Sequence, residues 1–279
     1  MTPSRTQASQ PEASEPALEV RGLQVSYGDR RVLEHIDMTV PKRDIRVILG
    51  GSGSGKSTCL RAILGLIPST GSVKMLGQEL TGLGERQRQL HQQRIGVMFQ
   101  NGALFGSLTV AQNVALPLLE HARVPAEVAQ ELVRMKLNLV GMGHAEHLYP
   151  AQLSGGMKKR AALARAMILD PALLFCDEPS AGLDPLTSAE LDGLLLHVRA
   201  LFGTTIVVVT HELQSIETIA DSVIMLGKGR VIAEGPKELI KRQGIPEVDM
   251  FFARQLSQSH LSGMSVAQLF GVGSGGETQ

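Results

Sequence analysis

Hydrophobic positions form several short, mostly apolar runs along the chain, and each run ends in polar side chains. The runs cover residues 45–49, 95–99, 172–176 and 206–210. Continuous runs of this length, without alternation, are typical of strands that are buried on both faces of a sheet. Each run therefore predicts a core strand that delivers polar groups at its carboxyl end.

Other segments predict strands and a helical insertion. Residues 18–20 and 23–25 alternate in strand fashion, and residues 71–77 predict a further strand and turn. Between about residues 108 and 148 the apolar spacing becomes helical, which predicts an inserted helical lobe. We expect its core to include Val128, Leu132, Met135 and Leu139.

The two ends of the chain differ from its middle. Residues 1–16 are rich in polar residues and proline, so we expect disorder there, and the Gly-rich residues 271–279 are expected to be mobile. After a short predicted helix at 237–240, apolar side chains share one helical face at Val248, Phe251, Phe252 and Leu256. We expect this face to dock on a second copy of the chain, with packing on the chain's own core as the alternative.

A phosphate-binding loop is predicted directly after the run 45–49. Its pattern, G-x-x-x-x-G-K-[ST], is carried by Gly50, Gly51, Ser52, Gly53, Ser54, Gly55, Lys56 and Ser57. Backbone N–H groups of such a loop surround a β-phosphate, the lysine reaches the β- and γ-phosphates, and the serine hydroxyl ligates Mg²⁺. The alternative is a glycine-rich turn with a chance lysine. The full pattern between a strand and a helix favours nucleoside triphosphate binding.

Two carboxylates, Asp177 and Glu178, end the run 172–176. In this arrangement one acid can hold a metal through water while the next polarises the attacking water. Glu178 is the candidate catalytic base, and service as a metal ligand only is the alternative. Cys59 and Cys176 lie inside a predicted helix and strand, so we interpret them as small buried residues rather than a redox pair.

Further polar groups occur at three other places. Ser154, Gly155 and Gly156 open a helix-forming stretch and make a second anion site, which one nucleotide does not need. His211 follows the run 206–210, and Gln100 follows the run 95–99. A lone histidine at a strand end is commonly satisfied by a backbone carbonyl, but the position of His211 after this strand and before Glu212 favours a functional role.

In these motifs and their order, residues 18–240 resemble the ATPase subunit of ABC transporters. The resemblance implies an α/β P-loop NTPase with a RecA-like core of mixed sheet, an antiparallel β subdomain and an inserted helical subdomain at about 105–165. It implies a Walker A loop at residues 50–58, ending in Thr58, a signature motif at 153–157 and a D-loop at 181–184. The corresponding domain bounds are a disordered tail at 1–16, an ATPase domain at 17–243 and a partly helical extension at 244–279.

The resemblance also assigns roles to single residues. It makes Glu178, His211 and Gln100 catalytic, and it gives Mg²⁺ to Ser57, Gln100 and Asp177. ATP is the implied nucleotide, with adenine stacked on Tyr27, although a tyrosine there is also an ordinary turn residue. Asp184 belongs to the D-loop, or merely ends a loop before Pro185. In the family two subunits pair head to tail, so Ser154, Gly155 and Gly156 of one copy close over the nucleotide of the other.

The loop sequences narrow the resemblance to the ATPase of Mla-type transporters, which move phospholipids with an MCE-domain lipid-binding partner. The residues that carry this narrower resemblance are 99–118, Met157 and 180–185. The implied partners are a second copy, an integral membrane permease, the MCE-domain protein and a small regulatory subunit. Residues 103–105 either pack in the core or receive a cytoplasmic helix of the permease. The alternatives are transport of another solute, a soluble ABC protein acting on ribosomes or DNA, and a simple kinase, which would leave the signature and His211 unexplained.

Composition agrees with this interpretation. The 279 residues are 43% hydrophobic, enough for a sizeable core, and Lys+Arg and Asp+Glu are equal at 27 each, so no global charge favours nucleic acid. No apolar run approaches the ~20 residues that span a bilayer. We therefore expect a soluble protein in the cytoplasm, held on the inner face of the bacterial cell membrane through the permease.

Overall fold

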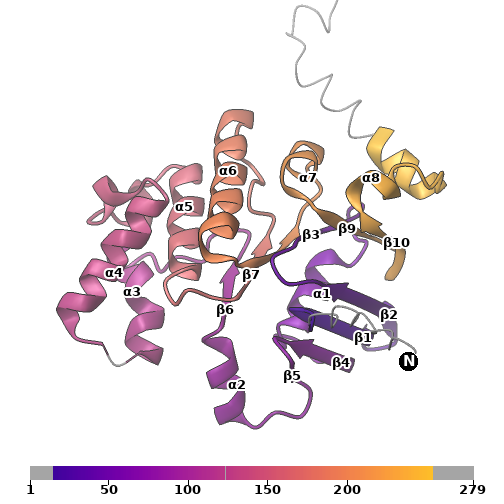
Figure 1. The fold of residues 1–279 in the computed structure, drawn as a ribbon, viewed down its shortest axis with the longest axis horizontal. Helices are drawn as coiled ribbons and strands as arrows, with labels where there is room; N and C mark the ends of the chain where they lie inside the picture. The colour runs from indigo at the N-terminus through magenta and orange to yellow at the C-terminus, as the bar shows by residue number, and fades with distance from the viewer. Residues whose placement is uncertain (1–14, 123, 254–279) are drawn as a thin grey trace, which may run out of the picture.

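The computed structural model describes residues 15–122 and 124–253 (Figure 1). Within these residues, the strands form one ten-stranded sheet in the order β5-β4-β1-β2-β10-β9-β3-β8-β7-β6. They are β1 Leu18–Tyr27, β2 Arg30–Val40, β3 Ile45–Leu49, β4 Thr70–Met75, β5 Gln78–Glu79, β6 Ile95–Met98, β7 Leu173–Asp177, β8 Thr205–Val209, β9 Ser222–Gly227 and β10 Arg230–Pro236.

Helices cover the sheet and form a lobe beside it. They are α1 Lys56–Ile63, α2 Glu85–Gln92, α3 Val110–His121, α4 Ala126–Leu139, α5 Gly155–Ala166, α6 Pro185–Phe202, α7 Leu213–Ile219 and α8 Lys237–Ile240, with 3-10 turns η1 Gly143–Ala145 and η2 Pro150–Gln152. Residues 246–253 are helical as well. Helices α3, α4 and α5 lie between β6 and β7 in the chain and gather on one side of the sheet in Figure 1.

The parallel half of the sheet consists of β9, β3, β8, β7 and β6. Strands β3, β7 and β8 are buried along their whole length, as the continuous apolar runs predicted, whereas β6, from the run 95–99, is only half-buried. Their pairing is nearly level, since Val209 faces both Ile48 and Asp177, and Cys176 faces Met98. The segments that follow these strands therefore meet at one edge of the sheet.

The antiparallel half consists of β5, β4, β1 and β2, with β10 joining β2 to the rest. Its inner face packs on α1 in a separate core cluster that includes Leu18, Leu33, Met75, Leu60 and Ile63. The alternation of apolar and polar residues at 18–20 and 23–25 reflects this arrangement, because only one face of the strand is buried. The helix that follows the phosphate-binding loop thus packs against both the antiparallel and the parallel half of the sheet.

The apolar stripe expected in the helical lobe is confirmed for Leu132 and Leu139, which pack against the core, and is wrong for Val128 and Met135. Met135 is 58% exposed and Val128 is also exposed, whereas Leu132 and Leu139 are only partly buried. The face of α4 that packs on α3 and α5 carries Ala129, Val133 and Leu137. Both stripes have helical spacing, so spacing alone does not decide which of them faces the neighbouring helices.

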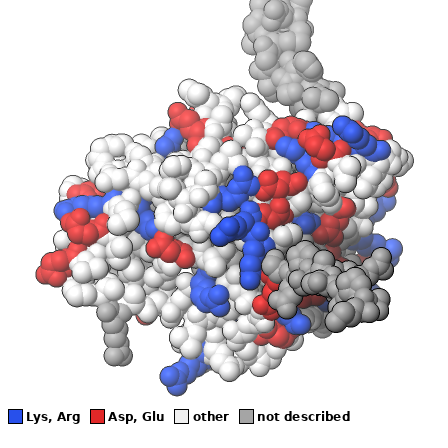
Figure 2. Space-filling view, viewed as in Figure 1, with Lys and Arg blue, Asp and Glu red and all other residues white. Residues whose placement is uncertain are grey.

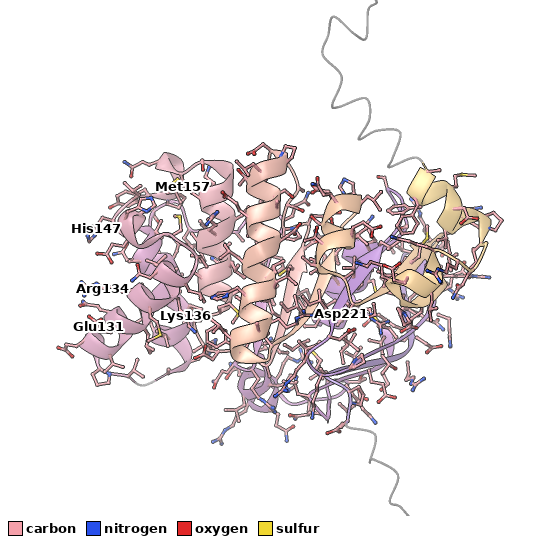
Figure 3. The ribbon with its side chains drawn as sticks, turned by 45° about the horizontal axis from the view of Figure 1, so that its top comes forward. Glu131, Arg134, Lys136, His147, Met157 and Asp221 are labelled. Atoms are coloured by element: carbon pink, nitrogen blue, oxygen red, sulfur yellow. The ribbon has the colours of Figure 1, made fainter. Side chains whose placement is uncertain are left out.

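Lys136 joins the lobe to the rest of the molecule (Figure 3). Its side chain is buried, and its Nζ forms an ion pair with Asp170, which precedes β7. The same Nζ lies 4.4 Å from the ring centroid of Phe202, at the end of α6. A cation–π contact and an ion pair therefore fix the base of α4 to two segments of the core.

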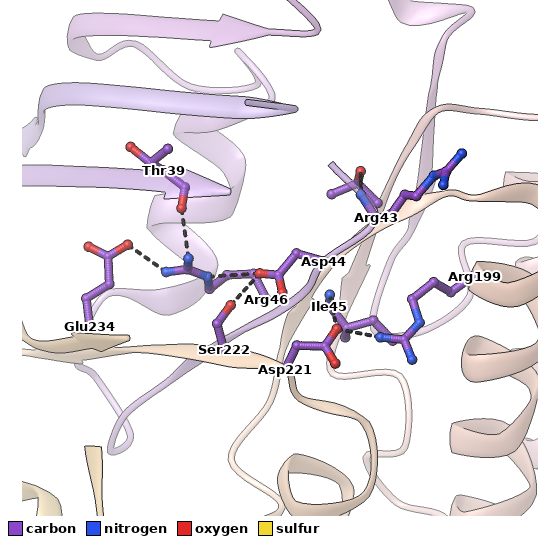
Figure 4. A network of polar contacts seen from close by, with 10 residues as sticks. Thr39, Arg43, Asp44, Ile45, Arg46, Arg199, Asp221, Ser222 and Glu234 are labelled. Atoms are coloured by element: carbon purple, nitrogen blue, oxygen red, sulfur yellow. Dashed lines mark hydrogen bonds and ion pairs between the residues drawn. The ribbon is translucent and has the colours of Figure 1, made fainter. Parts of the chain in front are cut away.

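A second polar network fixes the amino end of β3 (Figure 4). The buried guanidinium of Arg46 donates to Glu234 of β10 at 2.6 Å and to the Thr39 carbonyl of β2 at 2.8 Å. Asp221 accepts from the Ile45 N–H at 2.9 Å. These contacts tie β3 to both halves of the sheet at the end opposite the phosphate-binding loop.

The described part of the C-terminal extension packs on its own chain. Val248 and Phe251 are buried in the same core cluster as Leu49 and Met225, and Phe252 packs against it. This corrects the expectation that these side chains dock on a second copy. An apolar helical face is buried against an apolar surface within its reach. Here that surface lies beside β9 of the same chain. Leu256 lies outside the described residues, as do most of residues 1–16 and all of 271–279.

The surface carries charges of both signs. On the face in Figure 2, Lys and Arg side chains lie among Asp and Glu side chains, in keeping with totals of 27 each. In the part of the chain that the structure describes, no helix combines the length and the apolar character that crossing a lipid bilayer requires.

Asp192 is a buried carboxyl group in α6, with 2% of its surface exposed. Burial raises its pKa to about 6; a hydrogen bond from Ser215 opposes the shift, and the charge of Glu212 adds to it. Its Oδ1 atom has no hydrogen-bond partner among the described residues. At neutral pH this site therefore holds a poorly solvated charge between α6 and α7.

Asp192→Asn should raise the free energy of unfolding at pH 8 more than at pH 5. Because the folded-state pKa lies above the ordinary 3.8, the folded state holds an extra proton between about pH 4 and 6, and stability from this group falls as pH rises through that window. Urea unfolding at both pH values should show a gain of about 1–2 kcal/mol at pH 8. Asp29→Asn, an exposed control, should show no such difference. Equal gains at both pH values for Asp192→Asn would contradict the assignment.

Candidate active site

The phosphate-binding loop runs from β3 to α1 as the sequence predicted. Gly50 has φ 150°, and a Cβ there would lie 2.2 Å from the Leu226 carbonyl oxygen, so only glycine fits against β9. Gly55 caps α1 with φ 104° and no side-chain acceptor. The first N–H groups of α1 are thus left for an anion.

A cavity of about 800 Å³ opens over this loop. Its lining combines the loop with the ends of three other strands and with the C-terminal extension: residues 50–58, Gln100, Glu178, His211, Met225, Glu247, Met250 and Phe251. Residues far apart in the sequence meet here because their strands end at one edge. The volume is of the size that ligand pockets have.

Lys56 is buried at the floor of the cavity. Its Nζ donates to the carbonyls of Gly50 at 2.8 Å and Gly51 at 3.1 Å. Burial lowers the pKa of Lys56, although Glu178 and Asp177 oppose that shift. The ammonium therefore lies beside two carboxylates, within the loop that would receive a phosphate.

Asp177 and Glu178 are both buried at the end of β7. Burial raises the pKa of Asp177, and the charge of Glu178 adds to it, whereas Arg61, Lys159 and Lys56 oppose it. Asp177 Oδ1 and Glu178 Oε2 have no hydrogen-bond partner among the described residues. Buried carboxylate oxygens without partners are costly unless a cation or a water molecule satisfies them.

Glu178 and His211 contact each other directly. His211 Nδ1 lies 2.9 Å from Glu178 Oε1, and the imidazole is about half exposed toward the cavity. When Glu178 is ionised it can only accept, so Nδ1 then carries the proton. The backbone of Glu178 is left-handed, with φ 46°. Two of the sequence-predicted catalytic residues are thus paired, and the third, Gln100, lines the same cavity.

Lys159 is a site residue that the sequence analysis missed. It lies in α5, is 6% exposed, and donates through Nζ to the backbone carbonyls of Gln100 and Glu178. Met225, Glu247, Met250 and Phe251 were also not predicted to line the cavity. A signal for Lys159 exists in the sequence, because it shares a helical face with Gly156 and Leu163.

The donor set fits a magnesium-bound triphosphate. Lys56 and the N–H groups of the loop suit phosphate oxygens, and the unpartnered oxygens of Asp177 and Glu178 suit a hydrated cation. Among the described residues no group of three or more His, Cys, Asp or Glu side chains could hold a metal by itself. Mg²⁺ is commonly held by one or two protein groups together with substrate phosphates, so this donor set is adequate for it.

The signature residues lie apart from this cavity. Ser154 caps α5 by accepting from the Met157 N–H at 3.2 Å, and Ser154 and Gly155 are exposed. Gly156 is buried, and a Cβ there would lie 2.5 Å from Thr187 Cγ2 of α6. Of these three residues, none lines the cavity of the same chain. Gly156 thus has a packing role in addition to any contact with a ligand.

Tyr27 and Asp184 also lie outside the cavity lining. Tyr27 ends β1 with its ring about half exposed. Asp184 caps α6, accepting from the N–H groups of Leu186 at 3.1 Å and Thr187 at 3.0 Å. Hydrogen bonds to Thr187 lower the pKa of Asp184. The helix cap accounts for Asp184, and its contact with a nucleotide stays a prediction.

Comparisons with known proteins agree on the family. A family model described as ABC transporter matches residues 33–181. The chain is 37% identical over 235 residues to the intermembrane phospholipid transport system ATP-binding protein MlaF of Escherichia coli (strain K12), covering 84% of this chain and 87% of that protein. For MlaF of Haemophilus influenzae the identity is 39% over 222 residues, covering 79% and 84%.

Mycobacterial relatives are equally similar. The chain is 39% identical over 236 residues to the probable ribonucleotide transport ATP-binding protein mkl of Mycobacterium leprae (strain TN). That alignment covers 84% of this chain and 68% of the mycobacterial protein. The chain therefore spans about two thirds of the length of this relative.

Solved structures give the same result. The structure of cbiO1 from Clostridium perfringens, part of the ABC transporter complex cbiONQ, has a TM-score of 0.75 and 28% identity, covering 90% of this chain and 100% of that chain. A dimeric post-hydrolysis state of the ATP-binding cassette MJ0796 with ADP and Pi has a TM-score of 0.71 and 29% identity, covering 78% and 98%. The predicted P-loop NTPase fold is confirmed. With these motifs placed as described, the chain belongs to the ABC transporter family and is one of its ATP-hydrolysing, Mla-type ATP-binding subunits.

Proposed function

We propose that two copies of this chain power phospholipid transport by a membrane permease that works with an MCE-type lipid-binding partner. The observation that carries the proposal is the 37–39% identity to the two phospholipid transport proteins over about four fifths of the chain. The protein would lie in the cytoplasm on the inner face of the cell membrane, bound through the permease, with a small regulatory subunit as a further partner. The chain itself touches no lipid.

The chemistry that we propose for the site combines its contacts with the roles that the family resemblance implies. Glu178 Oε2 lacks a partner and takes a proton from the attacking water, while His211 holds Oε1 at 2.9 Å. Lys56 exchanges its loop carbonyls for phosphate oxygens, and Gln100 orients water and metal. Ser57, Asp177 and Gln100 would hold Mg²⁺, which would neutralise phosphate charge. Tyr27 stacks on adenine.

Glu178→Gln should leave ATP binding intact and lower turnover about 10²–10⁴-fold, the usual contribution of a general base. Lys56→Ala should instead weaken binding roughly 10–100-fold, because it removes charge-assisted hydrogen bonds to ground-state phosphate. Phosphate release and the Kd for Mg-ATP measure the two effects. Glu238→Gln, an exposed control with the same chemical change, should match the wild type. Near-normal turnover of the Glu178→Gln protein would remove Glu178 from the base role.

The dimer completes the site. Ser154 and Gly155 are exposed and do not line the cavity of their own chain, yet the amino end of α5 would suit a second anion. In a head-to-tail dimer this end closes over the partner's cavity, so each of the two sites is shared. Closure excludes water and completes the site, and hydrolysis reopens it.

Mixed dimers test the sharing. A purified heterodimer of Ser154→Arg and Lys56→Ala subunits should retain about half of wild-type ATPase activity if the sites act independently, because one shared site keeps both intact halves. A heterodimer of a wild-type subunit with a subunit that carries both Ser154→Arg and Lys56→Ala should be inactive, since each of its shared sites contains one damaged half. Sites built within single chains give the opposite result in both heterodimers, which would contradict the shared arrangement.

The permease-docking surface is proposed beside Gln100. Phe105 is 57% exposed. A separate hollow of about 640 Å³ is lined by the end of α1, β4, α2, β6 and Phe99. His91 in this hollow is buried, and neither ring nitrogen has a hydrogen-bond partner among the described residues. The exposed apolar ring of Phe105 favours a partner surface, here a cytoplasmic helix of the permease meeting residues 103–105.

The substrate is tested in the reconstituted complex. ATP-dependent transfer of labelled phospholipid between proteoliposomes and the MCE partner should be present with the wild type and absent with Glu178→Gln, because only turnover drives the cycle. The name of the mycobacterial relatives gives a second candidate, ribonucleotide transport. ATP-driven uptake of a labelled ribonucleotide, without phospholipid transfer, would replace the lipid assignment and leave the ATPase intact.

A further inference from the structure

Lys159 connects the signature helix to two separate parts of the active site. It follows Ser154 by little more than one turn of α5 and points inward, with 6% of its surface exposed. Its Nζ donates to the carbonyl of Glu178 at 2.9 Å and to the carbonyl of Gln100. One ammonium thus bonds the backbone of the proposed base and of the residue proposed to orient water.

The local charges explain how an ammonium can be buried here. Burial lowers the pKa of Lys159, whereas Glu178 and Asp177 are the strongest opposing charges. An ammonium has three donors, and two of them meet carbonyl oxygens. Lys158, the preceding residue in the chain, is partly exposed and makes no such side-chain hydrogen bond to another described residue. The inward position therefore belongs to Lys159 alone of this pair.

The bond to Glu178 acts on a strained peptide. A non-glycine residue at φ 46° is disfavoured and persists only where neighbours hold it. The Glu178 N–H donates to Val209 at 2.8 Å, and its carbonyl accepts from Lys159 at 2.9 Å and from Ala181 at 3.3 Å. This backbone direction sends the carboxylate toward His211. Releasing the carbonyl would let the peptide relax and move the carboxylate.

The bond to Gln100 continues along the same loop. Arg165, also in α5, donates to the carbonyls of Gly102 and Ala103, each at 2.8 Å. Asn113 of α3 accepts from the Phe105 N–H at 2.7 Å and donates to its carbonyl at 3.1 Å. Residues 100–105 are therefore held by side chains of the helical lobe rather than by the sheet from which they emerge.

We propose that Lys159 is a positioning residue for ATP hydrolysis, which fixes the backbone of Glu178 and Gln100 and makes their geometry depend on the position of α5. When the amino end of α5 closes on the partner's nucleotide, the same helix sets the site of its own chain. The inference rests on the proposed base role of Glu178.

Lys159→Met keeps the length of the side chain and removes its donors. In the full chain it should lower kcat about 10–100-fold, since small misplacement of a catalytic group costs this much, and leave the KM for ATP within about threefold. Lys159→Arg, which retains charge and donors, should recover most of the rate. Lys158→Met, the same change one residue earlier, should behave as the wild type. If the Met protein does not fold, Lys159→Gln takes its place in the same assays.

Combination with Glu178→Gln separates positioning from general destabilisation. Because the proposal places part of the effect of Lys159 on Glu178, the loss of turnover in the double variant should be clearly smaller than the product of the two single losses. A full, additive loss in the double variant, or a lower melting temperature with unchanged kcat, overturns the proposal. A Glu178→Gln protein with normal turnover would instead refute the base role itself, so the two failures are distinguishable.

Discussion

Everything at the active site depends on the level parallel pairing of four neighbouring strands. Because β3, β8, β7 and β6 end within a few residues of one another, Gly50, His211, Glu178 and Gln100 reach a single edge of the sheet. A shift of one residue in any strand would turn its side chains to the other face. The Arg46 network holds β3 at its opposite end and leaves the loop end free for a ligand.

Charge balance is the second constraint on the site. Lys56 and Lys159 lie beside Asp177 and Glu178, and all four are buried. Buried ion pairs contribute little net stability, but removing one member leaves an uncompensated charge. Under the proposed function, a triphosphate would add negative charge to this cluster, and a cation at the unpartnered carboxylate oxygens would offset it. We therefore expect the site to take nucleotide and metal together more readily than either alone.

Local patterns were sufficient to predict the loop and the strands. The loop 50–57, the strand ending in Asp177 and the cap at Ser154 each follow from a few neighbouring residues. Properties that depend on distant neighbours were not accessible in this way. In α4 the stripe through Ala129 is buried instead of the one through Val128, because α3 and α5 decide which face packs. The apolar face at Val248 was recognised, but its partner, the surface near Met225, was not.

The position of Lys159 could have been predicted from the sequence only in part. Lys158 and Lys159 are chemically identical, and only the phase of α5 distinguishes them, since Gly156, Lys159 and Leu163 are all buried. Gly156 was interpreted as an anion-binding residue, and its contact with Thr187 gives it a packing role that fixes the same phase. A lysine one residue away would face outward. The inward position of Lys159 is thus determined by the phase of α5, and this phase can be predicted once the packing of Gly156 on Thr187 is known.

Under the proposed function, the same contacts explain how hydrolysis becomes movement. Lys159, Arg165 and Asn113 hold the backbone from Gln100 to Phe105, so this loop moves with the helical lobe. Lys136 of α4 attaches another part of the lobe to Asp170 and Phe202. A change at the phosphates displaces α5, α5 displaces the loop, and the exposed Phe105 at the end of that loop meets the permease. The loop between nucleotide and partner is short and held at each step, which favours transmission of small displacements over their dissipation.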